Sequence, residues 1–416
     1  MVKLNKNILL VEPDYYTRFP PLGLLKIGRY HEQIKKDKVG YVRGNEPKDS
    51  SDIRYVNDIK FNGEPDIIYV TSLFTWAWKP VHVAVKHYKD LYPNSKILLG
   101  GPYASLFPDK AKESGADVIP GLFQEAEDLM PMYELIDDVW DGSIIFSSRG
   151  CVRKCTFCAV PILEKDIHNV KNSIKHLVYK KHTKIIFWDN NILGAANWRP
   201  IFDELQEIGK KVDFNQGIDA RLITDEVAEK LSKLKMQYIR IAYDRQSMGK
   251  YVKNAIKKLV NYGVNPRKIL SYMMYNYEDD SQDLFERTRD LLNWGATAYP
   301  MRYQPVLDKE YSLEKNKYIS PKWNKKQLQK IAETRRVVGF GGTFPPYKKL
   351  VDRFNETSSF EELVPDNEQN KSNIEKLSKN KKKSTENSRL KNTKPRYGKG
   401  LGWMKIETVK KRVKIN

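Results

Sequence analysis

Three cysteines offer the most specific chemistry in this sequence. Cys151, Cys155 and Cys158 follow Cys-x3-Cys-x2-Cys spacing, and they are the only cysteines among the 416 residues. Three thiolates fall short of the four protein ligands of a structural zinc site, whereas thiolates are the usual ligands of iron–sulfur clusters. Three of them would hold three corners of a four-iron cubane and leave the fourth iron open to a small molecule. The spacing therefore favours a 4Fe-4S cluster with one open iron.

This motif resembles the signature of the radical S-adenosylmethionine (SAM) family in the number and spacing of its cysteines. Phe157 stands before the last cysteine, where the family places an aromatic side chain against the adenine of SAM. The resemblance implies that the open iron chelates the amino and carboxylate groups of SAM. It also implies that the reduced cluster cleaves SAM to a 5′-deoxyadenosyl radical, with electrons from a reducing protein such as flavodoxin or ferredoxin.

Two other interpretations of the cysteines stay open at this point. A zinc site could recruit His168, although it lies ten residues beyond Cys158, outside the usual short ligand spacings. The three residues could also be buried free thiols, although chance would scatter such thiols through the chain.

Length and composition restrict the class of protein. A chain of 416 residues, 40% of them hydrophobic, is long enough for two or three domains with sizeable cores. Its few cysteines argue against a disulfide-stapled secreted protein and for a reducing cytosol. The apolar run at residues 8–11 is too short for a signal peptide, and no later run is long enough to span a membrane. We therefore expect a cytoplasmic protein with no membrane partner.

The charge is strongly basic and unevenly placed. The formal net charge is +21, and residues 366–416 hold sixteen Lys or Arg against five Asp or Glu. Such a balance suggests an acidic partner such as RNA or DNA, and Tyr397 and Trp403 lie among the basic residues as in nucleic-acid-binding segments. The alternatives are a surface that only keeps the protein soluble and, for the polar stretch from residue 364, a flexible tail.

Residues 1–130 alternate strand and helix patterns, which predicts a Rossmann-like parallel sheet covered on both faces. We expect strands at residues 7–11, 39–42, 67–71, 96–99 and 117–119. The helical spacing of apolar residues predicts helices at 22–34 and 81–91. Ligands of such sheets bind beyond the carboxyl ends of the strands.

The loops at those ends resemble the cobalamin-binding domain that precedes many radical SAM cores. Thr71 and Leu73 match the Ser/Thr-x-Leu pair of that domain, and Gly100 and Gly101 match its Gly-Gly pair. Both pairs line the cleft for the nucleotide tail in the family, and glycines let the backbone approach a ligand closely. The family's Asp-x-His-x-x-Gly motif has no match, because residues 14–18 read Asp-Tyr-Tyr-Thr-Arg. The resemblance thus implies either cobalamin without a protein histidine on cobalt, or a domain that kept the fold and lost the cofactor.

A linker at residues 131–142 precedes a repeating strand-then-helix pattern at 143–305. Its expected strands are 144–148, 184–188, 212–216, 238–243, 268–275 and 297–303, and its helices are 170–181, 200–210, 225–234, 248–261 and 281–292. Six such units are similar to the partial (β/α)6 barrel of the radical SAM family. Residues 306–363, with a helix at 325–338 and a loop at 339–343, are expected to extend over the barrel. A basic tail follows at 364–416.

In such a barrel the chemistry lies at the carboxyl ends of the strands. Polar candidates for binding SAM follow the second, third and fourth strands: Asp189, Asn190, Asn191, Gln216, Arg221 and Asp244. The resemblance places the SAM amino group at residues 189–191. Arg221 has the geometry to bind a carboxylate, and Asp244 is a candidate for the ribose hydroxyls. Each of these residues alone is equally explained as a turn former or a member of a surface ion pair.

The sequence therefore predicts a radical SAM enzyme that modifies an unreactive carbon, with cobalamin-dependent methylation as the expected outcome if cobalamin binds. One alternative is cobalamin-independent modification of RNA or DNA. Another is a non-catalytic iron–sulfur protein that binds partners or transfers electrons. The methylthiotransferase branch is disfavoured, because it needs cysteines for a second cluster and none remain.

Overall fold

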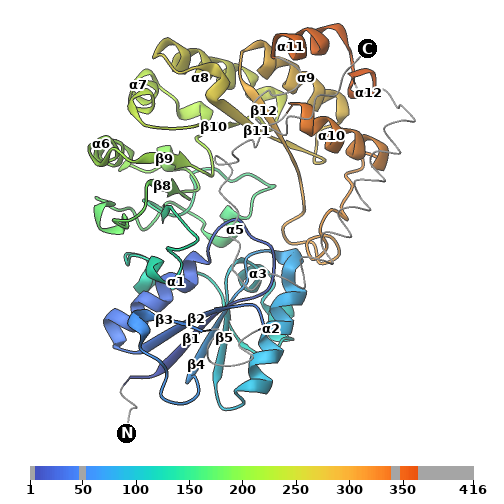
Figure 1. The fold of residues 1–416 in the computed structure, drawn as a ribbon. Helices are drawn as coiled ribbons and strands as arrows, with labels where there is room; N and C mark the ends of the chain where they lie inside the picture. The colour runs from blue at the N-terminus through green and yellow to red at the C-terminus, as the bar shows by residue number, and fades with distance from the viewer. Residues whose placement is uncertain (1–4, 46–52, 339–346, 364–416) are drawn as a thin grey trace, which may run out of the picture.

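The computed structural model describes residues 5–45, 53–338 and 347–363 (Figure 1). The predicted loop at 339–343 and the basic tail at 364–416 lie outside the described residues. Within the described ranges, no helix has both the length and the apolar character needed to cross a membrane.

A six-stranded sheet forms the N-terminal part of the molecule. Its strands are β1 (Asn7–Glu12), β2 (Lys38–Arg43), β3 (Arg54–Tyr55), β4 (Ile67–Thr71), β5 (Lys96–Gly100) and β6 (Asp117–Ile119). The spatial order is β3-β2-β1-β4-β5-β6, and every neighbouring pair is parallel except β2 and β3. The five predicted strands are confirmed, whereas β3 has only two residues and gives no periodic signal. The order in which the strands are added reverses between β1 and β4: β2 and β3 lie on one side of this point, and β5 and β6 lie on the other.

Helices cover both faces of this sheet (Figure 1). They are α1 (Leu22–Tyr30), which continues into a π-helical turn at His31–Lys35, and α2 (Trp78–Leu91), α3 (Pro102–Leu106) and α4 (Pro108–Lys112). Helix α2 buries Val81, Val85 and Tyr88, which recur at helical spacing and pack on one face of the sheet. Helix α1 packs on the other face.

Residues 131–142, predicted to be a linker, instead form part of the core. Met132, Tyr133 and Ile136 have no exposed surface, and they pack together with α1 and the strands on either side. The Tyr133 hydroxyl accepts a hydrogen bond from the backbone nitrogen of Ile144 at 2.7 Å. Pro131 and the acidic residues of this segment gave it a loop-like appearance in sequence, but its apolar residues fill the space between the two parts of the molecule.

Six parallel strands form the second part, in two sheets of three (Figure 1). The first sheet contains β7 (Ser143–Ile145), β8 (Lys184–Phe187) and β9 (Lys211–Phe214), and the second contains β10 (Ile239–Ala242), β11 (Ile269–Tyr275) and β12 (Thr297–Arg302). A hydrogen bond from the nitrogen of Ile218 to the carbonyl of Arg240, at 2.7 Å, links the chain after β9 to β10. The six predicted strands are confirmed, with a break between β9 and β10.

The helices of this part are α5 (Val160–Leu163), α6 (Trp198–Ile208), α7 (Asp225–Lys233), α8 (Gly249–Asn261), α9 (Ser281–Asn293), α10 (Lys325–Val338), α11 (Tyr347–Glu356) and α12 (Phe360–Leu363). Thr224 and Asp280 cap α7 and α9 through the backbone nitrogens three residues on, at 3.2 and 2.9 Å, as their sequence positions suggest. Trp323, Leu350 and Phe354 join α9 in the main core, so α10, α11 and α12 extend the layer of helices outside the strands.

The predicted helix at 170–181 is wrong. Only a 3-10 turn forms there, at Lys175–Leu177, and Asn169 precedes the segment in a left-handed conformation with φ of 48°. Glu204 of α6 then accepts hydrogen bonds from the Ser173 hydroxyl and the Ile174 nitrogen, at 2.6 and 2.7 Å. Ile174 and Leu177, whose spacing suggested a helix, are instead buried in an extended crossover.

Candidate functional site

The three cysteines lie on one loop at the carboxyl end of β7, and all three are half-buried. The backbone nitrogens of Arg153 and Val160 lie 3.3 Å and 3.4 Å from the sulfurs of Cys151 and Cys158. Burial raises the pKa of Cys155 and of Cys158, and the neighbouring thiols raise both further. The three thiols thus share one loop, with amide donors at two of them, and thiolates are the usual ligands of iron–sulfur clusters.

The turn that begins this loop requires glycine. Gly150 has a φ of +76°, and a Cβ built on it would lie 1.9 Å from the carbonyl oxygen of Asp166. Arg149 and His168 pair through their backbones here, with N–O distances of 2.9 and 3.1 Å. The Nδ1 atom of His168 hydrogen-bonds the Asp166 carbonyl at 2.8 Å. Among the residues that the structure describes, no three or more His, Cys, Asp or Glu side chains gather as ligands of a metal ion.

A buried ionic network connects the cysteine loop to the N-terminal sheet. Arg149 binds Glu127 in a bidentate manner at 2.8 and 2.9 Å, and Glu164 accepts a hydrogen bond from the Gly150 nitrogen at 2.8 Å. Lys26 of α1 donates to the Glu127 carbonyl at 2.6 Å. Burial lowers the pKa of Lys26 to about 8. Burial by itself raises the pKa of Glu127, but the charge of Arg149 reverses this and leaves that pKa below its usual value.

Asp189 stabilises the chain at the end of β7. Its carboxylate accepts four hydrogen bonds, from the backbone nitrogens and hydroxyls of Ser147 and Ser148, at 2.6 to 2.9 Å. The next residue, Asn190, donates to Glu164 at 3.1 Å. Asn191 comes closest to the cysteines, with its Nδ2 atom 3.6 Å from the sulfur of Cys151. Of these three candidates, Asn191 is therefore the one placed to contact a ligand at the cysteine loop.

Asp219 links the third strand to the cysteine loop. It accepts hydrogen bonds from Arg153 at 2.9 Å and from Arg221 at 2.7 and 3.0 Å. Burial alone would raise the pKa of Asp219, but these arginines hold it below its usual value. The positive charge of Arg221 offsets part of the effect by which burial raises the pKa of Cys155, so the two side chains are neighbours. Arg221, which was predicted to bind the carboxylate of SAM, is already paired with Asp219. Gln216 is exposed in the turn after β9.

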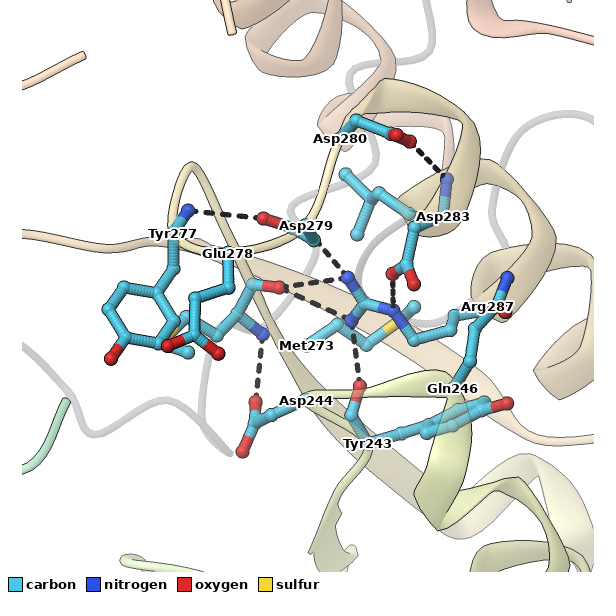
Figure 2. Close-up of polar contacts among 12 residues, drawn as sticks. Tyr243, Asp244, Gln246, Met273, Tyr277, Glu278, Asp279, Asp280, Asp283 and Arg287 are labelled. Atoms are coloured by element: carbon cyan, nitrogen blue, oxygen red, sulfur yellow. Dashed lines mark hydrogen bonds and ion pairs between the residues drawn. The ribbon is translucent and has the colours of Figure 1, made fainter. Parts of the chain in front are cut away.

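Asp244 borders a cleft of about 200 Å³ at the carboxyl ends of β10 and β11 (Figure 2). The cleft is lined by Asp244, Arg245, Met274, Tyr277, Glu278, Asp279 and Asp283. One oxygen of Asp244 accepts a hydrogen bond from the Met274 nitrogen at 2.9 Å. Burial raises the pKa of Asp244, and its charge in turn raises the pKa of Cys155 and Cys158. The predicted ribose acceptor thus borders a cleft, and its charge acts on Cys155 and Cys158.

A fully buried arginine fixes the shape of this cleft. Arg287 of α9 donates to the carbonyls of Tyr243 and Met274 at 2.8 and 3.2 Å, and it forms ion pairs with Asp279, at 2.7 Å, and Asp283 (Figure 2). Burial raises the pKa of Asp279 to about 6. Sequence analysis missed Arg287; the available signal was its position on the apolar face of α9.

Phe157 of the cysteine loop contacts Tyr277, one of the residues that line the cleft. Its ring meets that of Tyr277 edge-on, with 5.8 Å between centroids, and Tyr277 in turn contacts Tyr303 at 4.6 Å. The neighbouring Thr156 hydroxyl lies 2.8 Å from the Tyr277 hydroxyl. The aromatic residue singled out in sequence therefore lies between the cysteines and an aromatic wall at the end of β11.

The glycine pair of the N-terminal sheet packs against protein. Gly101 has a φ of +100°, and a Cβ there would lie 2.5 Å from the carbonyl oxygen of Ser72. The Ser72 hydroxyl donates to the Gly100 carbonyl at 2.7 Å. Thr71 and Leu73 flank Ser72 at the end of β4. This close packing explains why position 101 is a glycine.

Comparison with known proteins identifies the fold. No protein-family model and no curated protein matches the sequence. Among solved structures, the chain is similar to TsrM of Kitasatospora setae, a radical SAM methyltransferase whose structure holds cobalamin and a 4Fe-4S cluster. The TM-score is 0.57 at 10% sequence identity, over 72% of this chain and 76% of that one. The two proteins thus share an α/β fold built on parallel sheets.

Proposed function

We propose that this protein is a radical SAM enzyme that modifies an unreactive carbon of its substrate. The observation that carries the proposal is the grouping of Cys151, Cys155 and Cys158 on one loop beside a polar cleft. These three thiolates would hold a 4Fe-4S cluster. When bound and reduced, such a cluster supplies the electron that cleaves SAM to a 5′-deoxyadenosyl radical. The shared fold supports the same conclusion, because the neighbouring structure is a radical SAM methyltransferase.

The residues around the cleft would bind and orient SAM. Asp244 is placed to accept hydrogen bonds from ribose hydroxyls, and Phe157 and Tyr277 offer aromatic surface for the adenine. Asn191 lies beside the sulfur of Cys151, so its amide is placed to contact the amino-acid part of SAM. Arg221 would share its guanidinium between Asp219 and the SAM carboxylate.

Cobalamin-dependent methyl transfer is a second candidate. It is favoured by the neighbouring structure, which holds cobalamin. Residues 14–18 lack the family's Asp-x-His-x-x-Gly motif, so this chain offers no histidine there as a cobalt ligand. We therefore give precedence to a reaction that needs only SAM and the cluster.

Two partners belong to the proposal. The net charge of +21 supports RNA or DNA as the substrate class, bound through the basic residues of 364–416. A flavodoxin or ferredoxin would supply the electron to the cluster.

The proposal is tested with the Cys155→Ser variant after anaerobic reconstitution with iron and sulfide. The unmodified protein should form 5′-deoxyadenosine from SAM under reducing conditions, and the variant should lose both bound iron and this product. Val152→Ala is a matched control, because Val152 lies in the same loop and is 48% exposed. Formation of 5′-deoxyadenosine by Cys155→Ser at the unmodified rate would refute the radical SAM assignment.

A further inference from the structure

Tyr15 lies where a sheet of this kind would bind a ligand. In open parallel sheets, ligands enter the crevice beyond the carboxyl ends of the two strands at which the strand order reverses. Here those strands are β1 and β4. Tyr15, in the loop after β1, is 8% exposed and packs in the core with residues of both strands, including Val11 and Val70. Its ring meets Phe74 edge-on, with 6.2 Å between centroids.

A backbone contact holds the loop that carries Tyr15. Burial and the Glu12 carboxylate raise the pKa of the Tyr15 hydroxyl. The carbonyl of Tyr15 accepts a hydrogen bond from Arg43 of β2 at 3.1 Å. Thr71 and Leu73 are the pair expected from sequence to line a nucleotide-tail cleft; Thr71 ends β4, and Leu73 packs against the core cluster that contains Tyr15.

On the other side of the crevice, the Ser72 hydroxyl also has its hydrogen-bond partners within the protein. The Ser72 hydroxyl donates to Gly100 and accepts from the Ala104 nitrogen at 3.1 Å, and Ser72 has no exposed surface. Gly101 leaves no room for a Cβ against Ser72. The glycines therefore allow two loops of the protein to touch each other.

We propose that the Tyr15 side chain closes the crevice between β1 and β4, so that this chain takes no cobalamin nucleotide tail there. The buried ring of Tyr15, packed against Phe74 and the core beside β1 and β4, fills the space that a planar nucleotide base would need. The following residue offers a contrast, because Tyr16 is 72% exposed. This inference is independent of the cysteine loop, and a failure of either proposal leaves the other standing.

The test compares two corrinoids on the full-length protein by equilibrium dialysis with cobalt quantification. Hydroxocobalamin carries the nucleotide tail and cobinamide lacks it, so the ratio of their affinities measures insertion of the tail. The unmodified protein should bind both within about twofold of each other. Tyr15→Ala should prefer hydroxocobalamin by about tenfold or more, an increment of about 1.4 kcal/mol. Tyr16→Ala should behave like the unmodified protein.

Two further variants keep the test decisive. Tyr15→Phe retains the ring and should leave the crevice closed, whereas Tyr15→Val opens it with a smaller change in volume should Tyr15→Ala fail to fold. Circular dichroism and iron content confirm that each variant is folded and holds its cluster. A tenfold preference of the unmodified protein for hydroxocobalamin would overturn the proposal. So would folded Tyr15→Ala and Tyr15→Val proteins that gain no preference.

Discussion

Replacing Glu127 with Gln tests whether the ionic network positions the cysteine loop. The change keeps the size of the side chain but removes the charge that binds Arg149 through two hydrogen bonds, at 2.8 and 2.9 Å. The two side chains are 11% and 9% exposed, so solvent screens their interaction little. Arg149 directly precedes Gly150 and Cys151, and a loosened guanidinium would release the start of the loop.

The expected cost follows from the geometry. Removing one partner of a buried ion pair costs about 3–5 kcal/mol, because the remaining charge stays buried. Gln retains one neutral acceptor, and Glu164 still lies 3.3 Å from Arg149. We therefore expect Glu127→Gln to lower the free energy of unfolding by about 3 kcal/mol, near the bottom of that range.

The assay is urea unfolding followed by circular dichroism, with bound iron measured on the same samples. Asp90→Asn is the matched control, since the Lys86–Asp90 pair is 76% and 66% exposed and such pairs contribute less than about 1 kcal/mol. Glu127→Gln should lose stability and iron, and Asp90→Asn should lose neither. Equal unfolding midpoints and equal iron content in the two variants would refute the positioning role.

Three further predictions address other parts of the molecule. Gly150→Ala should abolish iron binding, because its Cβ would lie 1.9 Å from the Asp166 carbonyl, whereas Gly23→Ala meets nothing within 4 Å and should bind iron normally. Burial lowers the pKa of His182 to about 4. The unfolded chain therefore binds an extra proton below about pH 6.5, and stability falls by up to about 3 kcal/mol as the pH drops to 4. Urea unfolding of His182→Asn should lack this part of the acid sensitivity, and an unchanged pH profile would contradict it. Truncation of 364–416 should abolish a steeply salt-dependent affinity for RNA in filter-binding measurements, and an unchanged salt slope would assign the charge to another role.

Local patterns predicted much of the fold. The strands of both parts and the grouping of the cysteines all depend on residues near one another in sequence. The position of Asp244 beside the cleft followed from the rule that ligands meet the carboxyl ends of strands.

The remaining features depend on contacts between distant segments. Asp189 looked like a free acceptor until Ser147 and Ser148 of another strand end were seen to bind it. Arg287 lies on the apolar face of α9, but the carbonyl and carboxylate groups that it binds come from other segments. Tyr15 could be placed in the crevice only once β4 was known to lie beside β1. Sequence periodicity carries no information about such partners.

The central claim is that three cysteines hold a cluster with one iron open to SAM. Its most direct test is electron paramagnetic resonance of the reduced, anaerobically reconstituted protein with and without SAM. We predict a cluster signal that changes when SAM binds and that is absent from Cys155→Ser. A cluster signal that saturating SAM leaves unchanged would contradict the claim.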